Sequence, residues 1–242
     1  GFHTGGALAF NKVDDKLYVT VGDAINARSA QNISSLNGKT LRINRDGTIP
    51  GDNPFPNSPV YTYGHRNMYG IAFDDHGHGI VTEAGEDLYD EINSQIKGGN
   101  YGWPIMQPAN KPPNPLANDS SIKPMRSYFF TKTPTQTIYY NNDKFPELKG
   151  KFIVGSFDGD LYAYKISDDG KRVLEEIILL TSSYPSNNIV ATAVSPNGDI
   201  YFGAYDIFKL EKLNLTSKQQ VMFPVQINAS YVKVSNVNYS EH

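Results

Sequence analysis

The sequence contains no cysteine among its 242 residues, which excludes disulfides, thiolate metal sites and a cysteine nucleophile. It also lacks any run of 18 or more apolar residues, so it predicts no transmembrane helix. Its 22 basic and 25 acidic side chains give a net charge of −3. That balance supplies no basic field for nucleic-acid phosphates and disfavours a nucleic-acid-binding function.

Tryptophan and methionine are scarce, with one and four residues, whereas 16 Tyr, 12 Phe, 21 Gly and 15 Pro are present. This composition favours strands and turns over helices. The chain opens at Gly1 without methionine or an apolar leader, which indicates processing or a start inside a longer protein. Asn-x-Ser/Thr acceptors indicate an extracellular, periplasmic or cell-surface protein, with chance occurrence as the alternative. They begin at Asn32, Asn118, Asn214, Asn228 and Asn238.

Short β-branched and aromatic runs recur along the chain beside turn residues. They cover residues 17–21, 79–82, 151–154 and 199–202, and each predicts a strand. A recurrence of about 50–70 residues, with two to four strands in each unit, is typical of a β-propeller. The predicted fold is therefore an all-β propeller, with a sandwich or a single barrel as the alternative.

At this period the chain supplies about four blades. The first unit begins at its inner strands, so we expect N-terminal blade sequence to be missing from this chain. We assign residues 1–210 to the propeller domain and residues 211–242 to a C-terminal strand or linker tail. Weak helical patterns occur at Tyr89–Ile96 and Asp168–Leu180, of which the second fits a turn plus a strand better. The Pro- and Asn-rich residues 106–123 predict a long surface loop.

Several sequence blocks occur in a specific order and spacing. They are His3-Thr4-Gly5-Gly6, Leu36-Asn37-Gly38-Lys39-Thr40-Leu41-Arg42, Gly64-His65-Arg66-Asn67, Asp90-Glu91-Ile92-Asn93 and Gly98-Gly99-Asn100-Tyr101-Gly102-Trp103-Pro104. Together they resemble the soluble quinoprotein glucose/sorbosone dehydrogenases, a family that includes the aldose sugar dehydrogenases. The resemblance covers about residues 3–210. It implies a six-bladed propeller of the quinoprotein glucose dehydrogenase type that uses pyrroloquinoline quinone (PQQ) and calcium.

The resemblance also implies roles for individual residues. His3 matches the general base that takes the proton of the sugar hydroxyl, chemistry to which an imidazole is suited. Asp23 matches the carboxylate that orients this base. Arg66 and Asn67 match the pair that hydrogen-bonds the quinone oxygens, where charge develops during hydride transfer. Gln31 is expected to be a further polar contact to the cofactor.

Two calcium sites are implied by the same resemblance. The backbone carbonyls of Gly85 and Glu86 match those that hold the cofactor's calcium, although the family often has proline where Glu86 stands. Glu91 and Tyr101 fit a second, structural calcium site. Carboxylate and carbonyl oxygens are the ligands that this hard cation prefers.

Without the resemblance these residues have ordinary interpretations. His3 would be a surface residue, and Arg66 a turn residue in a salt bridge. Asp90 and Glu91 would form a solvated pair of charges. Three histidines, His65, His76 and His78, raise the alternative of a zinc site, but a His-x-His pair in a Gly-rich turn is more often exposed.

The sequence departs from the family where later blades supply basic residues to the cofactor's carboxylates. Residues 186–191 contain no cation, and Asp158 and Asp160 stand where the family has a lysine nearby. Two hypotheses follow. The first is a PQQ-dependent dehydrogenase that oxidises the C1 hydroxyl of an aldose to the lactone, with an unidentified electron acceptor. The second is a non-catalytic calcium-containing propeller that binds a glycan or a protein at the cell surface.

Overall fold

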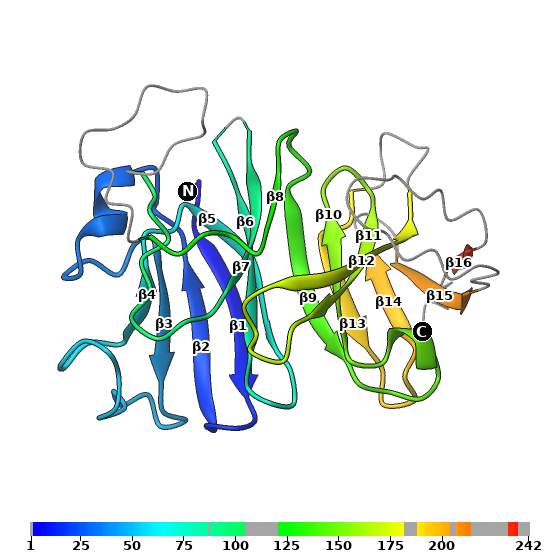
Figure 1. The fold of residues 1–242 in the computed structure, drawn as a ribbon, viewed down its shortest axis with the longest axis horizontal. Coiled ribbons are helices and arrows are strands. Elements are labelled where there is room, and N and C mark those ends of the chain that lie inside the picture. The colour runs from blue at the N-terminus through cyan, green and yellow to red at the C-terminus, as the bar shows by residue number, and fades with distance from the viewer. Residues whose placement is uncertain are drawn as a thin grey trace, which may run out of the picture. The chain divides into compact units, whose positions relative to one another are not determined.

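The computed structural model describes residues 2–86, 88–104, 121–181, 188–203, 207–213 and 232–236 (Figure 1). The chain divides into two compact units, Gly1–Pro134 and Thr135–His242. Each unit contains two four-stranded antiparallel sheets, in which neighbouring strands follow one another along the chain. Four such sheets agree with the predicted number of blades.

In the first unit, two sheets hold the strands in chain order. The first sheet consists of β1 (Gly5–Asn11), β2 (Lys16–Val21), β3 (Lys39–Ile43) and β4 (Val60–Tyr63). The second consists of β5 (Asn67–Phe73), β6 (Gly79–Ala84), β7 (Asp90–Ser94) and β8 (Arg126–Tyr128). A short 3-10 helix, η1 (Ala27–Gln31), lies between β2 and β3.

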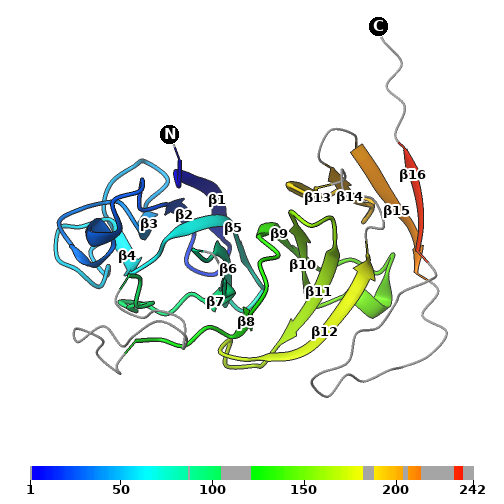
Figure 2. The ribbon, with the colours of Figure 1, turned by 90° about the horizontal axis from the view of Figure 1, so that it is seen from above.

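Apolar side chains join these two sheets where β1 and β5 lie side by side (Figure 2). Tyr18 of β2 belongs to one buried apolar cluster with Met68, Ile71 and Val81 of the second sheet. The Tyr18 ring lies 4.5 Å from the ring of Phe73, centroid to centroid. The sheets therefore bury their facing sides against each other, which a single thin blade cannot do alone.

In the second unit, the third sheet consists of β9 (Pro134–Tyr140), β10 (Lys151–Ser156), β11 (Leu161–Ile166) and β12 (Val173–Leu180). The fourth consists of β13 (Ala191–Val194), β14 (Ile200–Gly203), β15 (Ile207–Leu213) and β16 (Val232–Asn236). A second 3-10 helix, η2 (Pro146–Leu148), precedes β10. Tyr140, Ile153, Leu161, Ile200 and Phe202 belong to the apolar core of this unit.

The four strands predicted from residues 17–21, 79–82, 151–154 and 199–202 are confirmed as β2, β6, β10 and β14. The interpretation of Asp168–Leu180 as a turn plus a strand is confirmed by β12. The helix considered at Tyr89–Ile96 is wrong, because Tyr89 has φ of 64° and the following residues form β7, which pairs with β6 and β8. Most of the loop predicted at residues 106–123 lies outside the described residues.

The tail assigned to residues 211–242 includes the end of β15 and all of β16, which pairs with β15. The domain boundary at residue 210 stays a prediction. Among the described residues, none of the helices has the length and apolar character needed to cross a membrane.

Candidate active site

His3 and Asp23 meet because they flank neighbouring strands. His3 precedes β1 and Asp23 follows β2, and these antiparallel strands pair Gly5 with Val21 at that end. The His3 Nδ1 and Asp23 Oδ1 atoms are 2.8 Å apart, and Asp23 is buried. The Ala24 amide also donates to the His3 carbonyl over 3.1 Å. The imidazole is thus tied to a carboxylate, as a general base with a fixed tautomer requires.

The backbone at this corner is strained and tightly packed. His3, Ala24 and Ile25 have φ values of 52°, 53° and 61°, a region that side-chain-bearing residues rarely adopt. A Cβ at Gly22 would lie 2.1 Å from the His3 carbonyl oxygen, so only glycine fits there. Such strain persists where the surrounding structure determines the conformation, and it is common at functional sites.

Arg66 lies beside this pair, immediately before β5. Its carbonyl accepts a hydrogen bond from the Asp23 amide over 2.7 Å, and its amide donates to the Glu83 carboxylate. The Nη1 atom donates to the Ala84 carbonyl over 3.2 Å. Its buried Nε has no hydrogen-bond partner within the described part of the chain. The site therefore contains a guanidinium donor still available to an acceptor.

Trp103 connects Asp23 with Arg66. Its indole Nε1 donates to Asp23 Oδ2 over 2.8 Å, and the Arg66 guanidinium lies 5.5 Å from the centre of its ring. Gln31 Nε2 donates to the Trp103 carbonyl over 2.7 Å, and the Gln31 and Asn100 amides bond each other. Sequence reasoning noted the block that contains Trp103 but missed this role.

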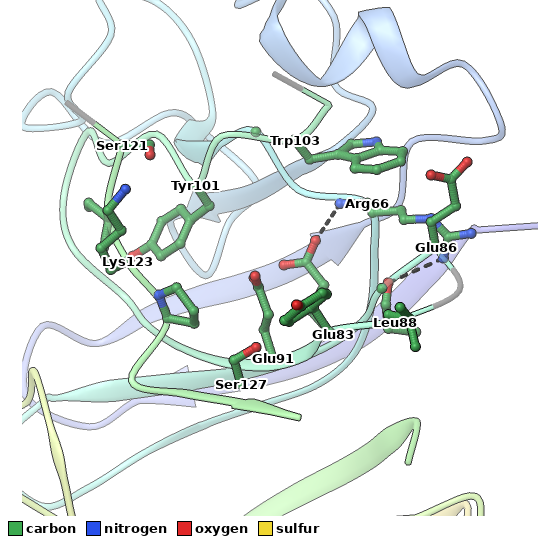
Figure 3. Close-up of a pocket in the computed structure, with 16 residues that line it drawn as sticks. Arg66, Glu83, Glu86, Leu88, Glu91, Tyr101, Trp103, Ser121, Lys123 and Ser127 are labelled. Carbon is green, nitrogen blue, oxygen red and sulfur yellow. Dashed lines mark hydrogen bonds between the residues drawn. The ribbon is translucent and has the colours of Figure 1, made fainter. Parts of the chain in front are cut away.

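A cavity of about 230 Å³ opens beside Arg66 and Trp103 (Figure 3). Seven of its lining residues are Arg66, Glu83, Gly85, Glu86, Glu91, Tyr101 and Trp103. It thus brings together Arg66 and all four residues predicted to hold calcium. Four predicted site residues do not line the cavity in the described structure: His3, Asp23, Gln31 and Asn67. Gln31 contacts the loop of Trp103, and Asn67 is buried at the start of β5.

The floor of this cavity carries paired carboxylates. Asn93 Nδ2 donates to both Glu83 Oε2 and Glu91 Oε2, over 3.2 and 3.0 Å, while its buried Oδ1 has no partner among the described residues. Desolvation, with a smaller contribution from the Glu83 charge, raises the pKa of the Glu91 carboxyl to about 8. Close carboxylates and an orphaned amide oxygen fit a bound cation with oxygen ligands.

Tyr101 is committed to the backbone through its hydroxyl. That hydroxyl donates to the Ser94 carbonyl and accepts from the Ile96 amide, and the ring stacks on His65 with 4.5 Å between centroids. Burial raises the pKa of the Tyr101 phenol to about 12. The phenol therefore stays protonated, and a cation at this site would use the backbone oxygen of Tyr101.

The ordinary interpretation of Asp90 and Glu91 without the family resemblance, a solvated pair of charges, is wrong for Asp90, which is fully buried. Asp90 Oδ1 accepts from the Gly85 amide over 2.8 Å, and its Oδ2 accepts from the Thr133 amide over 2.6 Å. Asp90 thus fixes the loop of Gly85 and Glu86. Its position at the start of a strand beside a glycine loop was the only signal in the sequence.

The histidines do not form a zinc site. His65 is buried between Thr62 and Glu83, with Nδ1 2.8 Å from Glu83 Oε2. The rings of His76 and His78 are 6.2 Å apart, and His78 Nδ1 contacts Asp74. Within the described ranges, no cluster of three or more His, Asp or Glu side chains is arranged to hold a metal. Calcium here would depend partly on backbone oxygens.

Comparison with known proteins identifies the family of the chain. The sequence model of the Glucose / Sorbosone dehydrogenase family matches residues 1–206. The chain is 30% identical to aldose sugar dehydrogenase YliI of Escherichia coli over 217 residues, covering 83% of this chain and 57% of that protein. Over 124 residues it is 40% identical to quinoprotein glucose dehydrogenase B of Acinetobacter calcoaceticus, covering 42% of this chain and 26% of the relative.

Among solved structures, the PQQ-bound aldose sugar dehydrogenase of Streptomyces coelicolor superimposes with a TM-score of 0.68 at 27% identity. The match covers 82% of this chain and 55% of that one, which confirms the predicted partial propeller. The chain thus spans about half the length of these relatives, and less of the Acinetobacter protein. On the family match, the chain belongs to the glucose/sorbosone dehydrogenase family.

Proposed function

We propose that the protein containing this chain is a PQQ-dependent dehydrogenase that oxidises the C1 hydroxyl of an aldose to the lactone. The observation that carries the proposal is the meeting of His3, Asp23 and Arg66 within one corner of the first unit. An imidazole tied to a carboxylate can take a hydroxyl proton, and a guanidinium nearby can stabilise a developing negative charge. Bound PQQ would supply the hydride acceptor.

The residues present fit the quinone on one side. The buried, unpartnered Arg66 Nε is a donor that an oxygen acceptor would satisfy. Asn67 follows Arg66 as the first residue of β5, and we assign it to the same acceptor group. Gln31 acts in our proposal through the loop of Trp103, because its amide is engaged there.

Calcium fits the cavity in two places. Gly85 and Glu86 lie on the loop that Asp90 fixes and would offer backbone carbonyls. Glu91 and Tyr101 would hold a second ion beside Glu83 and Asn93. A dication there would favour the ionised form of Glu91, whose pKa is raised in its absence.

The missing basic residues are the observation that favours the second hypothesis. Residues 188–191 carry no cation, and Asp160 of the β10–β11 turn accepts a hydrogen bond from the Tyr162 hydroxyl. Each charge-assisted hydrogen bond lost to the cofactor's carboxylates would weaken binding, at roughly 1.5–3 kcal/mol. A calcium-containing propeller that binds a glycan or a protein without catalysis is therefore the alternative.

The test uses the full-length protein, reconstituted with PQQ and calcium, and follows reduction of an artificial electron-accepting dye with several aldoses. We expect turnover that depends on both additions, with the lactone as product. His3→Ala should lose about 10²–10⁴-fold in kcat, the usual contribution of a general base.

His76→Ala is the matched control, because His76 lies in the β5–β6 turn and is expected to leave turnover unchanged. Absence of turnover in folded protein would contradict the proposal, as would equal rates for His3→Ala and the parent. Tight binding of PQQ without turnover would support PQQ as the cofactor but would contradict the proposed oxidation of an aldose. For location, the five Asn-x-Ser/Thr acceptors support a protein that acts outside the cytoplasm.

A further inference from the structure

The Asp23 carboxylate is held from two sides. Oδ1 receives His3 Nδ1 at 2.8 Å and the Ile25 amide at 3.0 Å. Oδ2 receives the Trp103 indole at 2.8 Å. Because each oxygen has its own donor, rotation of the carboxylate would break at least one of these bonds. The indole thus determines which oxygen faces His3.

Trp103 is itself anchored at several points. Its amide donates to the Gly64 carbonyl over 2.9 Å, and its carbonyl accepts from Gln31. A Cβ at Gly64 would lie 2.3 Å from Asn100 Oδ1, so this loop and the strand ends are packed in contact. These contacts fix the backbone of Trp103 beside the strand end that precedes Arg66.

Trp103 also contacts the side chain of Arg66. Its guanidinium lies 5.5 Å from the Trp103 ring centre, and Figure 3 shows the two side chains next to each other at the cavity. A cation over an indole face gains favourable electrostatic energy. The same ring therefore contacts both the carboxylate partner of the base and the side chain assigned to the quinone oxygens.

We propose that Trp103 is a positioning residue that fixes the Asp23 carboxylate relative to His3 and places the Arg66 guanidinium at the cavity. It acts through these side chains and transfers no proton itself. Its kinetic consequence rests on the proposed function, whereas its structural consequence is independent of any cofactor.

The first experiment measures the indole N–H by proton–nitrogen NMR in the apo protein. The Trp103 resonance is the one that disappears in Trp103→Phe. We expect slow hydrogen exchange in the parent, and in Asp23→Asn an upfield shift with faster exchange, because a neutral amide is a weaker acceptor. His76→Ala should leave this resonance unchanged. An indole resonance that is the same in Asp23→Asn and the parent would overturn the proposal.

The second experiment compares kinetics in the reconstituted full-length protein. Trp103→Phe keeps an aromatic ring and loses the N–H, and we expect kcat to fall about 10- to 100-fold with a smaller change in KM. The double variant with Asp23→Asn should be little worse than Asp23→Asn alone, because both changes break one interaction.

The positioning role would be overturned if the kcat losses of the two single variants multiplied in the double variant. It would also be overturned if Trp103→Phe changed only KM. Failure of the proposed function gives a different result. The parent would then show no turnover, while the indole resonance would still respond to Asp23→Asn.

Discussion

The two units of the chain differ in what they bury. The second unit has a core of aromatic and aliphatic side chains, and within its described residues the buried ionisable groups are Asp160 and Asp199 near turns, and tyrosines. The first unit buries many more charged or titratable groups. They include Asp23, Lys39, Arg42, His65, Asp74, Glu83 and Asp90.

Burying such groups is costly unless each one is paired. The first unit meets this requirement with specific bonds, such as those of Asp90 to Gly85 and Thr133. Among the described residues of this unit, three buried side-chain atoms have no hydrogen-bond partner: Arg66 Nε, Asn93 Oδ1 and Gln95 Nε2. Arg66 lines the cavity, and Asn93 donates to two glutamates that line it. Buried charged groups are therefore more numerous in the first unit, which also holds the cavity, whereas the described core of the second unit is mainly apolar.

Leu161→Ala tests the apolar side of this comparison and should have the largest effect. Leu161 is fully buried between the third and fourth sheets. Its truncation should lower the free energy of unfolding by about 2–5 kcal/mol, measured by denaturant titration. The Trp103 indole resonance should stay in place, and a large shift of that resonance would contradict the separation of roles.

Gly22→Ala tests the polar site through its backbone. The added methyl would meet the His3 carbonyl oxygen at 2.1 Å and displace the imidazole. A displacement of this kind is expected to lower kcat by roughly 10²-fold. Gly51→Ala is the matched control, since a Cβ there has nothing within 4 Å. Equal kcat for Gly22→Ala and the control would show that the His3 backbone is not held as described.

The pH dependence of the free energy of unfolding tests the cost of burying Lys39. Its ammonium donates to the Ser29, Ala30 and Asn37 carbonyls, yet desolvation lowers its pKa from 10.5 to about 8. Between pH 8 and 10.5 the unfolded chain keeps a proton that the folded chain has lost, so stability rises with pH. We expect the free energy of unfolding to increase over this range relative to Lys39→Met. A flat difference would mean that the three carbonyls fully offset desolvation.

Arg45→Ala should have the smallest effect. Arg45 and Asp15 form an ion pair in which both side chains are more than 60% exposed (62% and 63%), and solvent screens such pairs. We expect no resolvable loss of stability, measured by thermal unfolding at two salt concentrations. A loss as large as that of Leu161→Ala would contradict the view that buried groups dominate.

The sequence predicted the strands and the recurrence because alternating apolar residues and turn residues act locally. Its motifs also identified residues that the fold brings together, His3, Asp23 and Arg66 among them. It could not predict that Trp103 bonds Asp23, because that contact joins positions 80 residues apart. The helix considered at Tyr89–Ile96 failed for a related reason, since pairing with β6 and β8 overrides the local preference.

The positions of Gln31 and Asp90 also could not be predicted from the local sequence. Gln31 was expected at the cofactor, but its amide bonds Asn100 and Trp103. Asp90 belongs to one of the motif blocks, but the sequence assigned it no role at the site; it is buried and accepts from the backbone amides of Gly85, Lys132 and Thr133. Both outcomes depend on loops that fold back from other parts of the chain, which no local pattern records.

Calorimetric titration of the full-length protein with PQQ, in calcium and in a chelator, tests the central claim most directly. We expect saturable binding that requires calcium and that weakens in Arg66→Leu, because the guanidinium donor at the cavity is lost. Folded protein that binds no PQQ in calcium, or binds it equally well in the chelator and in Arg66→Leu, would contradict the assignment of this site.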